Sequence, residues 1–142
     1  MRHEHGSADP ADSAGDPADR VAQAMQAVPR ARFLPASHRH LAEQDAPLPI
    51  GDGQTNSQPT TVADMLRLLD VREGNRVLDL GAGAGWPAAL LAHLVGPDGE
   101  VLGVERQRSL LGPARAALAE AVPEARAGIR EARPGVLGAP ED

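Results

Sequence analysis

The chain has 142 residues, which is the size of one small domain. Hydrophobic residues make up 42% of it but aromatic residues only 1%, so the core must be built mainly from Leu, Val and Ala. The net charge of -6 provides no basic surface for nucleic acid, and the absence of cysteine excludes disulfides, thiolate metal sites and a cysteine nucleophile. No apolar segment has membrane-spanning length and no secretory signal opens the chain, which indicates a cytoplasmic protein without a membrane partner.

The first segments in chain order are a tail and a helix. Residues 1–15 are rich in Ala, Asp, Ser and Gly, and we predict a disordered acidic tail. The two histidines in this tail lack companion metal ligands, so no metal site is expected. Asp16 and Pro17 predict the start of an amphipathic helix with Asp16 as its cap, which Pro29 ends.

A polar loop and a second helix follow an irregular stretch over residues 30–46. Residues 47–59 read PLPIGDGQTNSQP, which is too polar and too often interrupted for regular structure, and loops of this kind often carry function. The next helix begins near Pro59 and has apolar residues at helical spacing from Val62 to Leu69. Ser57 either caps this helix or has a functional role, and the pattern alone favours the cap.

The stretch 76–85, RVLDLGAGAG, predicts a buried strand, a tight loop and the start of a helix at Trp86. Gly81, Gly83 and Gly85 let the backbone adopt positive φ and approach a ligand, while the helix start directs unpaired N–H groups at the same space. We therefore predict a site for an anionic or carboxylate-bearing ligand, although such a turn can also serve packing alone. A dinucleotide loop would have its third glycine at Trp86, which argues against NAD or FAD.

Residues 100–104 predict a second buried strand that ends at Glu105. An acid at this place in a βαβ unit can accept hydrogen bonds from both ribose hydroxyls, so the ligand is expected to be a nucleoside. A helix over residues 108–122 should be broken or kinked by Gly112 and Pro113, and residues 127–132 predict a weaker third strand.

Three segments, residues 24–35, 47–59 and 76–105, resemble the protein-L-isoaspartate O-methyltransferase family. The middle segment is the most specific, because methyltransferases in general share the glycine loop. The resemblance implies the N-terminal portion of an α/β, Rossmann-like class I methyltransferase sandwich, with about three parallel strands and flanking helices after a helical N-terminal extension. It also implies two parts after the tail, which are N-terminal helices with the substrate loop (16–70) and a partial S-adenosylmethionine-binding domain (71–142).

The resemblance further implies a reaction and the residues that carry it. The reaction is methyl transfer from S-adenosylmethionine to the free carboxylate of an isoaspartyl residue in a damaged protein or peptide. A carboxylate is already ionised near neutral pH, so no general base is required. Ser57 would be the catalytic residue and would hold the substrate together with Gln54 and Thr55. The cofactor would lie against Asp79, Gly81, Ala82, Gly83, Gly85 and Glu105, with Glu105 on its ribose.

The sequence also departs from the family pattern. Asn56 lies where the family usually has Ile, Thr60 where it has an aromatic residue, Pro87 where it often has a polar residue, and Pro134 where an acid binds the adenine. The family continues into a fourth strand beside the central one, so we expect an open apolar edge at residues 77–80, self-association through this edge, and weak or no activity of a truncated chain.

Three other functions remain open at this stage. The chain could be a relative that methylates a dedicated peptide to drive succinimide formation, or a non-catalytic fragment or binding module that keeps the front half of the fold. A dehydrogenase is the least favoured, because Trp86 occupies the position of the third glycine.

Overall fold

The computed structural model describes residues 19–136, 138 and 139, so the predicted tail 1–15 lies outside the described residues. The elements in chain order are α1 (Arg20–Ala27), the 3₁₀ helices η2 (Arg30–Phe33) and η3 (Ala36–Leu41), β1 (Leu48–Gly51), β2 (Gln54–Asn56), α2 (Pro59–Leu69), β3 (Arg76–Leu80), α3 (Trp86–Val95), β4 (Glu100–Glu105), α4 (Arg108–Ala121) and β5 (Ala127–Glu131). Within the described residues, no helix has the length and apolar character needed to cross a membrane.

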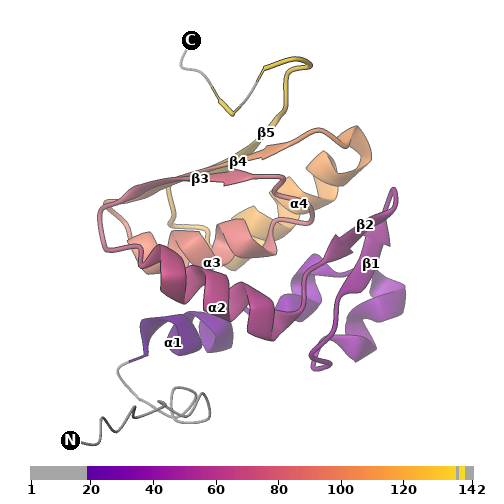
Figure 1. Cartoon of the computed structure of the whole chain (residues 1–142), viewed down its shortest axis with the longest axis horizontal. Helices are drawn as coiled ribbons and strands as arrows, with labels where there is room; N and C mark the ends of the chain where they lie inside the picture. Colours follow the sequence, from indigo (N-terminus) through magenta and orange to yellow (C-terminus); the bar gives the residue numbers. More distant parts are fainter. Residues whose placement is uncertain (1–18, 137, 140–142) are drawn as a thin grey trace, which may run out of the picture.

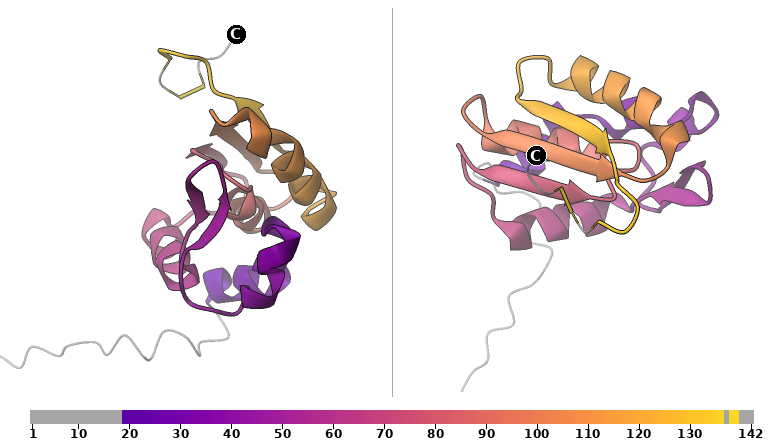
Figure 2. Two further views of the ribbon diagram at one scale, coloured as in Figure 1. Left: turned by 90° about the vertical axis from the view of Figure 1, so that its right-hand side faces the viewer. Right: turned by 90° about the horizontal axis from the view of Figure 1, so that it is seen from above.

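The three predicted strands are present, and they form one parallel sheet in the order β3-β4-β5 (Figure 1). The prediction that the first of them is buried is wrong, because no residue of β3 is buried. The register pairs Asp79 with Gly103 and Leu80 with Val104, so β3 and β4 end at the same edge. Helices cover one face of the sheet, and the right-hand view in Figure 2 shows the other face without helices over it. On this uncovered face Leu78 and Leu80 are 45% and 56% exposed. The sheet is therefore covered on one side only in the part of the chain that the structure describes.

The helix α3 forms the centre of the helical layer. Its sequence is apolar except for His93, and Ala88, Ala89 and Leu90 are fully buried, because α3 packs against β4 on one side and α1 on the other. The indole N–H of Trp86 donates a 3.0 Å hydrogen bond to the carbonyl of Val28, just after α1. This bond ties the start of α3 to the N-terminal extension.

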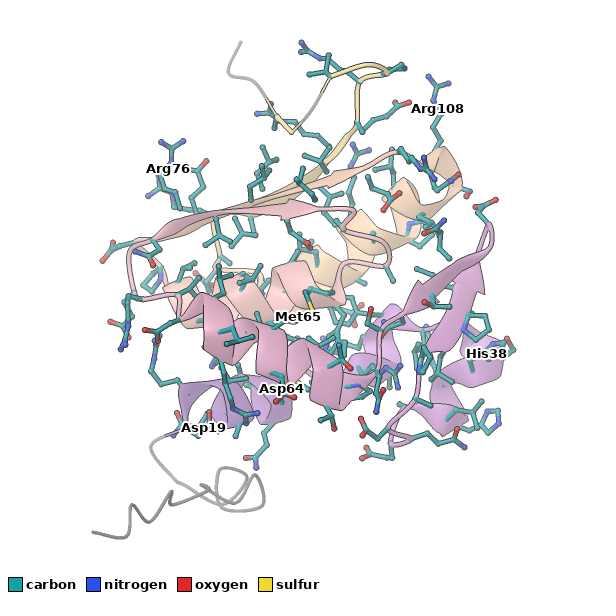
Figure 3. All side chains as sticks on the ribbon, viewed as in Figure 1. Asp19, His38, Asp64, Met65, Arg76 and Arg108 are labelled. Carbon is teal, nitrogen blue, oxygen red and sulfur yellow. The ribbon has the colours of Figure 1, made fainter. Side chains whose placement is uncertain are left out.

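The N-terminal cap of α1 is Asp19, so the predicted cap is wrong by one turn, and Asp16 itself lies outside the described residues. Asp19 Oδ1 accepts hydrogen bonds from the backbone N–H groups of Val21 and Ala22. Asp19 Oδ2 accepts a 2.7 Å bond from Arg67 of α2, and this bond holds the pKa of Asp19 below its usual range. Figure 3 labels Asp19 below α2, where one carboxylate both caps α1 and fastens it to α2.

The prediction that residues 47–59 lack regular structure is wrong, because β1 and β2 form an antiparallel hairpin. Leu48 and Ile50 alternate with exposed residues and are buried, which supplies the apolar face that a short hairpin needs. Three successive residues with positive φ, Gly51 to Gly53, make the turn. The sequence prediction overlooked the alternation of buried and exposed residues because the segment as a whole is polar.

Of the predicted break or kink in the fourth helix, the break is wrong, because α4 continues through Pro113. Pro113 lies in the second turn, where its missing N–H removes a single bond to the first turn. Leu110, Leu111, Ala114 and Leu118 are buried on both sides of it, so packing holds the helix together across the proline.

Candidate functional site

The glycine loop joins β3 to α3 at the carboxyl edge of the sheet. The backbone N–H groups of Gly81 and Ala82 both donate to the carbonyl of Val104, at 2.8 and 3.0 Å, so the loop is fastened to the end of β4. Gly81, Gly83 and Gly85 all have positive φ, at 77°, 55° and 95°. Such backbone angles are strained for residues other than glycine, which explains the alternating glycines.

The members of this loop differ in what surrounds them. A Cβ on Gly81 would meet nothing within 4 Å, whereas one on Gly85 would lie 3.2 Å from the carbonyl oxygen of Ala114. Ala82 is 2% exposed, and its Cβ would lie 2.9 Å from a Cβ on Gly103. Packing therefore explains why Ala82 and Gly85 are small, while Gly81 borders open space.

Glu105 reaches from the end of β4 into the glycine loop. Its Oε2 accepts a 2.7 Å hydrogen bond from the backbone N–H of Gly83, and its Oε1 accepts a 3.0 Å bond from that of Gln107. The residue is only 5% exposed. Each oxygen keeps a lone pair for a further donor, so the carboxylate is fixed in position and can still bind hydroxyl groups.

Asp79 is the second acid at this edge, one residue before the last residue of β3. Its Oδ2 is buried and has no hydrogen-bond partner within the described part of the chain. Burial raises the pKa of Asp79 to about 6, and the negative charge of Glu105 adds to this effect. A buried oxygen without a donor is rare in proteins and indicates a place where a ligand, an ion or water supplies the missing bond.

Ser57 lies between β2 and α2, and its hypothesised capping role is wrong. Asp45 caps α2 from outside, since its Oδ1 accepts from the N–H of Thr60 at 2.9 Å and its Oδ2 from the Thr60 hydroxyl at 2.7 Å. These bonds hold the pKa of Asp45 below its usual range. Ser57 is exposed, and its hydroxyl forms no hydrogen bond with any described residue. The serine is therefore free to contact a ligand.

The hairpin lies at the same end of the molecule as the carboxyl ends of the strands (Figure 1). Ile50 of β1 is the contact to the glycine loop, because its Cδ1 would lie 3.3 Å from a Cβ on Gly83. At the hairpin tip, Asp52 accepts a hydrogen bond from the Ser109 hydroxyl at the start of α4. The hairpin segment that carries Gln54, Thr55 and Ser57 thus belongs to the same end of the fold as Glu105.

A pocket of about 550 Å³ lies between the hairpin, the 3₁₀ helices and α4. Ala84 of the glycine loop lines it, but Ser57 and Glu105 do not. The described residues contain no group of three or more His, Cys, Asp or Glu side chains that could hold a metal ion. Figure 3 shows His38 on the outer side of the 3₁₀ segment, away from the sheet.

The sequence interpretation missed one buried residue of this region, Arg30. It is 5% exposed and donates to Asn56 Oδ1 at 2.9 Å and to the carbonyl of Ser57 at 3.2 Å. An arginine in a segment of mixed polarity gives no sequence signal for burial, because arginine is mostly exposed. Asn56, which stands where the family usually has Ile, could have indicated this burial, since an amide is a suitable partner for a buried guanidinium.

We predict that Asp79→Asn changes the pH dependence of stability. The folded-state pKa is raised to about 6 from 3.8, so the native state holds a proton that the unfolded state releases, and wild-type stability must fall as the pH rises from about 4 through 6. Asn mimics the protonated acid, and above pH 7 the variant should be more stable than wild type by up to about 3 kcal/mol, with little difference near pH 3. Urea unfolding followed by Trp86 fluorescence measures this, and parallel pH profiles would contradict it.

Residues 13–133 match the family described as protein-L-isoaspartate(D-aspartate) O-methyltransferase. A protein named protein-L-isoaspartate O-methyltransferase from Methanothrix thermoacetophila is 53% identical over 97 residues, which cover 68% of this chain and 46% of that protein. The protein of the same name from Methanopyrus kandleri is 54% identical over 97 residues, covering 68% and 43%. This chain thus spans less than half the length of these relatives.

Solved structures agree with the sequence relatives. A protein described as a protein-L-isoaspartate O-methyltransferase has a TM-score of 0.67 and 30% identity over 80% of this chain and 37% of its own. A candidate enzyme of the same name from Plasmodium falciparum, in complex with S-adenosyl-L-homocysteine, has a TM-score of 0.70 and 26% identity, covering 81% and 56%. The predicted Rossmann-like methyltransferase fold, present as its N-terminal portion, is confirmed. The chain belongs to the protein-L-isoaspartate(D-aspartate) O-methyltransferase family.

Proposed function

We propose that this chain supplies the cofactor site and the substrate loop of an S-adenosylmethionine-dependent carboxyl methyltransferase that acts on L-isoaspartyl residues of damaged proteins or peptides. The observation that carries the proposal is the pair of acids at the glycine loop, Glu105 with its oxygens fixed by backbone donors and Asp79 with an oxygen that lacks one. A ligand with ribose hydroxyls and an ammonium group would satisfy both. The relative solved with S-adenosyl-L-homocysteine supports the same ligand class.

The residues present fit this cofactor. In the proposal Glu105 accepts hydrogen bonds from the ribose hydroxyls, and Asp79 ionises and accepts from the ammonium group of the methionine part. Gly81 offers an uncrowded backbone, while Ala82, Gly83 and Gly85 hold the loop in shape. When bound, S-adenosylmethionine supplies the methyl group.

The substrate carboxylate would bind at the free hydroxyl of Ser57, with Gln54 and Thr55 beside it. A hydrogen bond from Ser57 would orient one carboxylate oxygen, so that the other is presented to the methyl carbon. No proton has to be removed, because the carboxylate is ionised near neutral pH. The reaction cancels a positive and a negative charge, so a site that excludes water favours it over solution.

Two further parts belong to the same proposal. Residues 16–70 would provide the substrate loop and residues 71–142 the cofactor site, and we propose a cytoplasmic location, with which a cysteine-free sequence is compatible. Methylation of one dedicated peptide and a non-catalytic binding role remain the alternatives. Isotope transfer from labelled cofactor to a panel of isoaspartyl peptides distinguishes all three.

We predict that the chain binds S-adenosylhomocysteine saturably and that Gly83→Val weakens binding at least a hundredfold. Valine would be strained at a φ of 55° and would collide with Ile50, so the loop could not keep its shape. The matched control is Gly74→Val, which places the same side chain at another positive φ of 83°, before β3, where a Cβ would meet nothing within 4 Å. Calorimetric titration measures both, and a folded wild-type chain that does not bind the compound would overturn the proposed function.

We predict that Ser57→Ala lowers methyl transfer without lowering stability, whereas Asp45→Ala lowers stability. Loss of a hydrogen bond to a charged group should lower isoaspartyl methyl transfer about tenfold or more in Ser57→Ala. Its free energy of unfolding should stay within about 0.5 kcal/mol of wild type, because the hydroxyl has no partner in the fold. Asp45→Ala should instead lower the midpoint of thermal unfolding, since it removes the cap of α2. Equal methyl transfer in wild type and Ser57→Ala would contradict the role of this serine.

We also propose that the chain self-associates through the edge of β3, which has no neighbouring strand among the described residues. Leu78→Lys should shift the mass measured by sedimentation toward the monomer, because a charged lysine at a strand edge opposes pairing. Leu68→Lys is the control, since Leu68 is 87% exposed but lies on α2. A monomeric wild-type chain at all concentrations would exclude this association.

A further inference from the structure

Arg30 holds the beginning and the end of the hairpin segment together. Its guanidinium donates to the side chain of Asn56 at 2.9 Å and to the carbonyls of Gln44, Ala46, Asn56 and Ser57, at 3.0, 2.7, 3.1 and 3.2 Å. Gln44 and Ala46 precede β1, whereas Asn56 and Ser57 end β2 and follow it. One side chain therefore closes the segment 44–57, which carries Ser57.

Burial of the Arg30 guanidinium has a desolvation cost that its hydrogen bonds have to offset. Removing a guanidinium from water is costly, and burial lowers the pKa of Arg30, an effect that the negative charge of Asp45 opposes. The five acceptors and this charge offset the desolvation. A lysine could not replace the arginine, because an ammonium group lacks the planar fork that reaches several acceptors at once.

The same guanidinium also contacts the cofactor side of the site. Its carbon atom lies 5.7 Å from the centroid of the Trp86 ring, which is within the range of a cation–π interaction. Trp86 directly follows Gly85 and begins α3, and its indole N–H is bonded to the carbonyl of Val28, two residues before Arg30. Arg30 is therefore in contact with both the glycine-loop helix and the substrate segment.

We propose that Arg30 is a positioning residue that sets Ser57 relative to the glycine loop, and that its contact with Trp86 couples cofactor binding to the order of the segment 44–57. Asn56 orients the guanidinium by accepting from Nε. The identity of the ligands rests on the proposed function, but the contacts of Arg30 do not. Arg30 touches neither ligand in this proposal and acts through Ser57 and Trp86.

Hydrogen exchange of the full chain, measured with and without S-adenosylhomocysteine, tests the proposal in Arg30→Lys and Asn56→Leu. Without ligand, amides in the segment 44–57 should exchange at least tenfold faster in Arg30→Lys and less so in Asn56→Leu, while β4 is unchanged. In wild type the ligand should slow exchange in this segment, and in both variants this slowing should be lost. The control is Arg32→Lys, because Arg32 is in the same 3₁₀ helix but, among the described residues, forms its hydrogen bond and ion pair with Glu120 at the surface.

The other possible results separate the positioning role of Arg30 from its coupling to cofactor binding. Unchanged exchange of the segment in Arg30→Lys overturns the positioning role. Faster exchange with the ligand-dependent slowing retained assigns Arg30 a purely structural role and overturns the coupling. If Arg30→Lys does not fold, Asn56→Leu decides by the same two readouts. A wild-type chain that fails to bind the ligand contradicts the proposed function and the coupling, while exchange without ligand still decides the positioning role.

Discussion

The attachment of the glycine loop to the end of β4 determines where the candidate ligand-binding groups lie. Gly81 and Ala82 share the carbonyl of Val104 as acceptor, and Gly83 donates to Glu105. These bonds hold the loop over the carboxyl ends of two parallel strands, which is the usual ligand position in open α/β sheets. The hairpin and the start of α3 are then arranged around this loop through Ile50 and Trp86.

The two acids at this edge, Glu105 and Asp79, differ in their hydrogen bonds, and this difference affects which ligands can bind. Glu105 is satisfied by backbone donors before any ligand arrives, so it is preorganised. Asp79 is buried with an unpartnered oxygen and a raised pKa, so its ionised form is disfavoured until a positive group approaches. A positively charged donor would therefore favour the ionised form of Asp79 more than a neutral donor would.

The uncovered side of the sheet shows how the chain differs from a two-sided sandwich. Leu78 and Leu80 of β3 lie on this side and are 45% and 56% exposed. Figure 3 shows Arg76 and Arg108 toward opposite ends of the sheet. The self-association proposed above would take place at this surface.

The local pattern of the sequence determined the three strands, the glycine loop and the approach of Glu105 to it. These features depend on residues that are close together in the chain: a short apolar run, alternating glycines, and an acid at the end of the next strand. Helix α2 followed from apolar spacing in the same way, since spacing decides which face of a helix is buried.

Only the tertiary structure decided the details of the segment 47–59 and of the helix ends. Packing against the glycine loop made a hairpin of a segment that its polar composition indicated to be irregular, and packing on both sides carried α4 through Pro113. The cap of α2 comes from Asp45, 15 residues before Thr60, and the partners of Arg30 lie 14 to 27 residues away. Local patterns cannot predict such contacts, because a hydrogen bond between distant residues depends on how the chain brings them together. The sequence therefore determined the glycine-loop side of the candidate site, while folding decided the arrangement around Ser57.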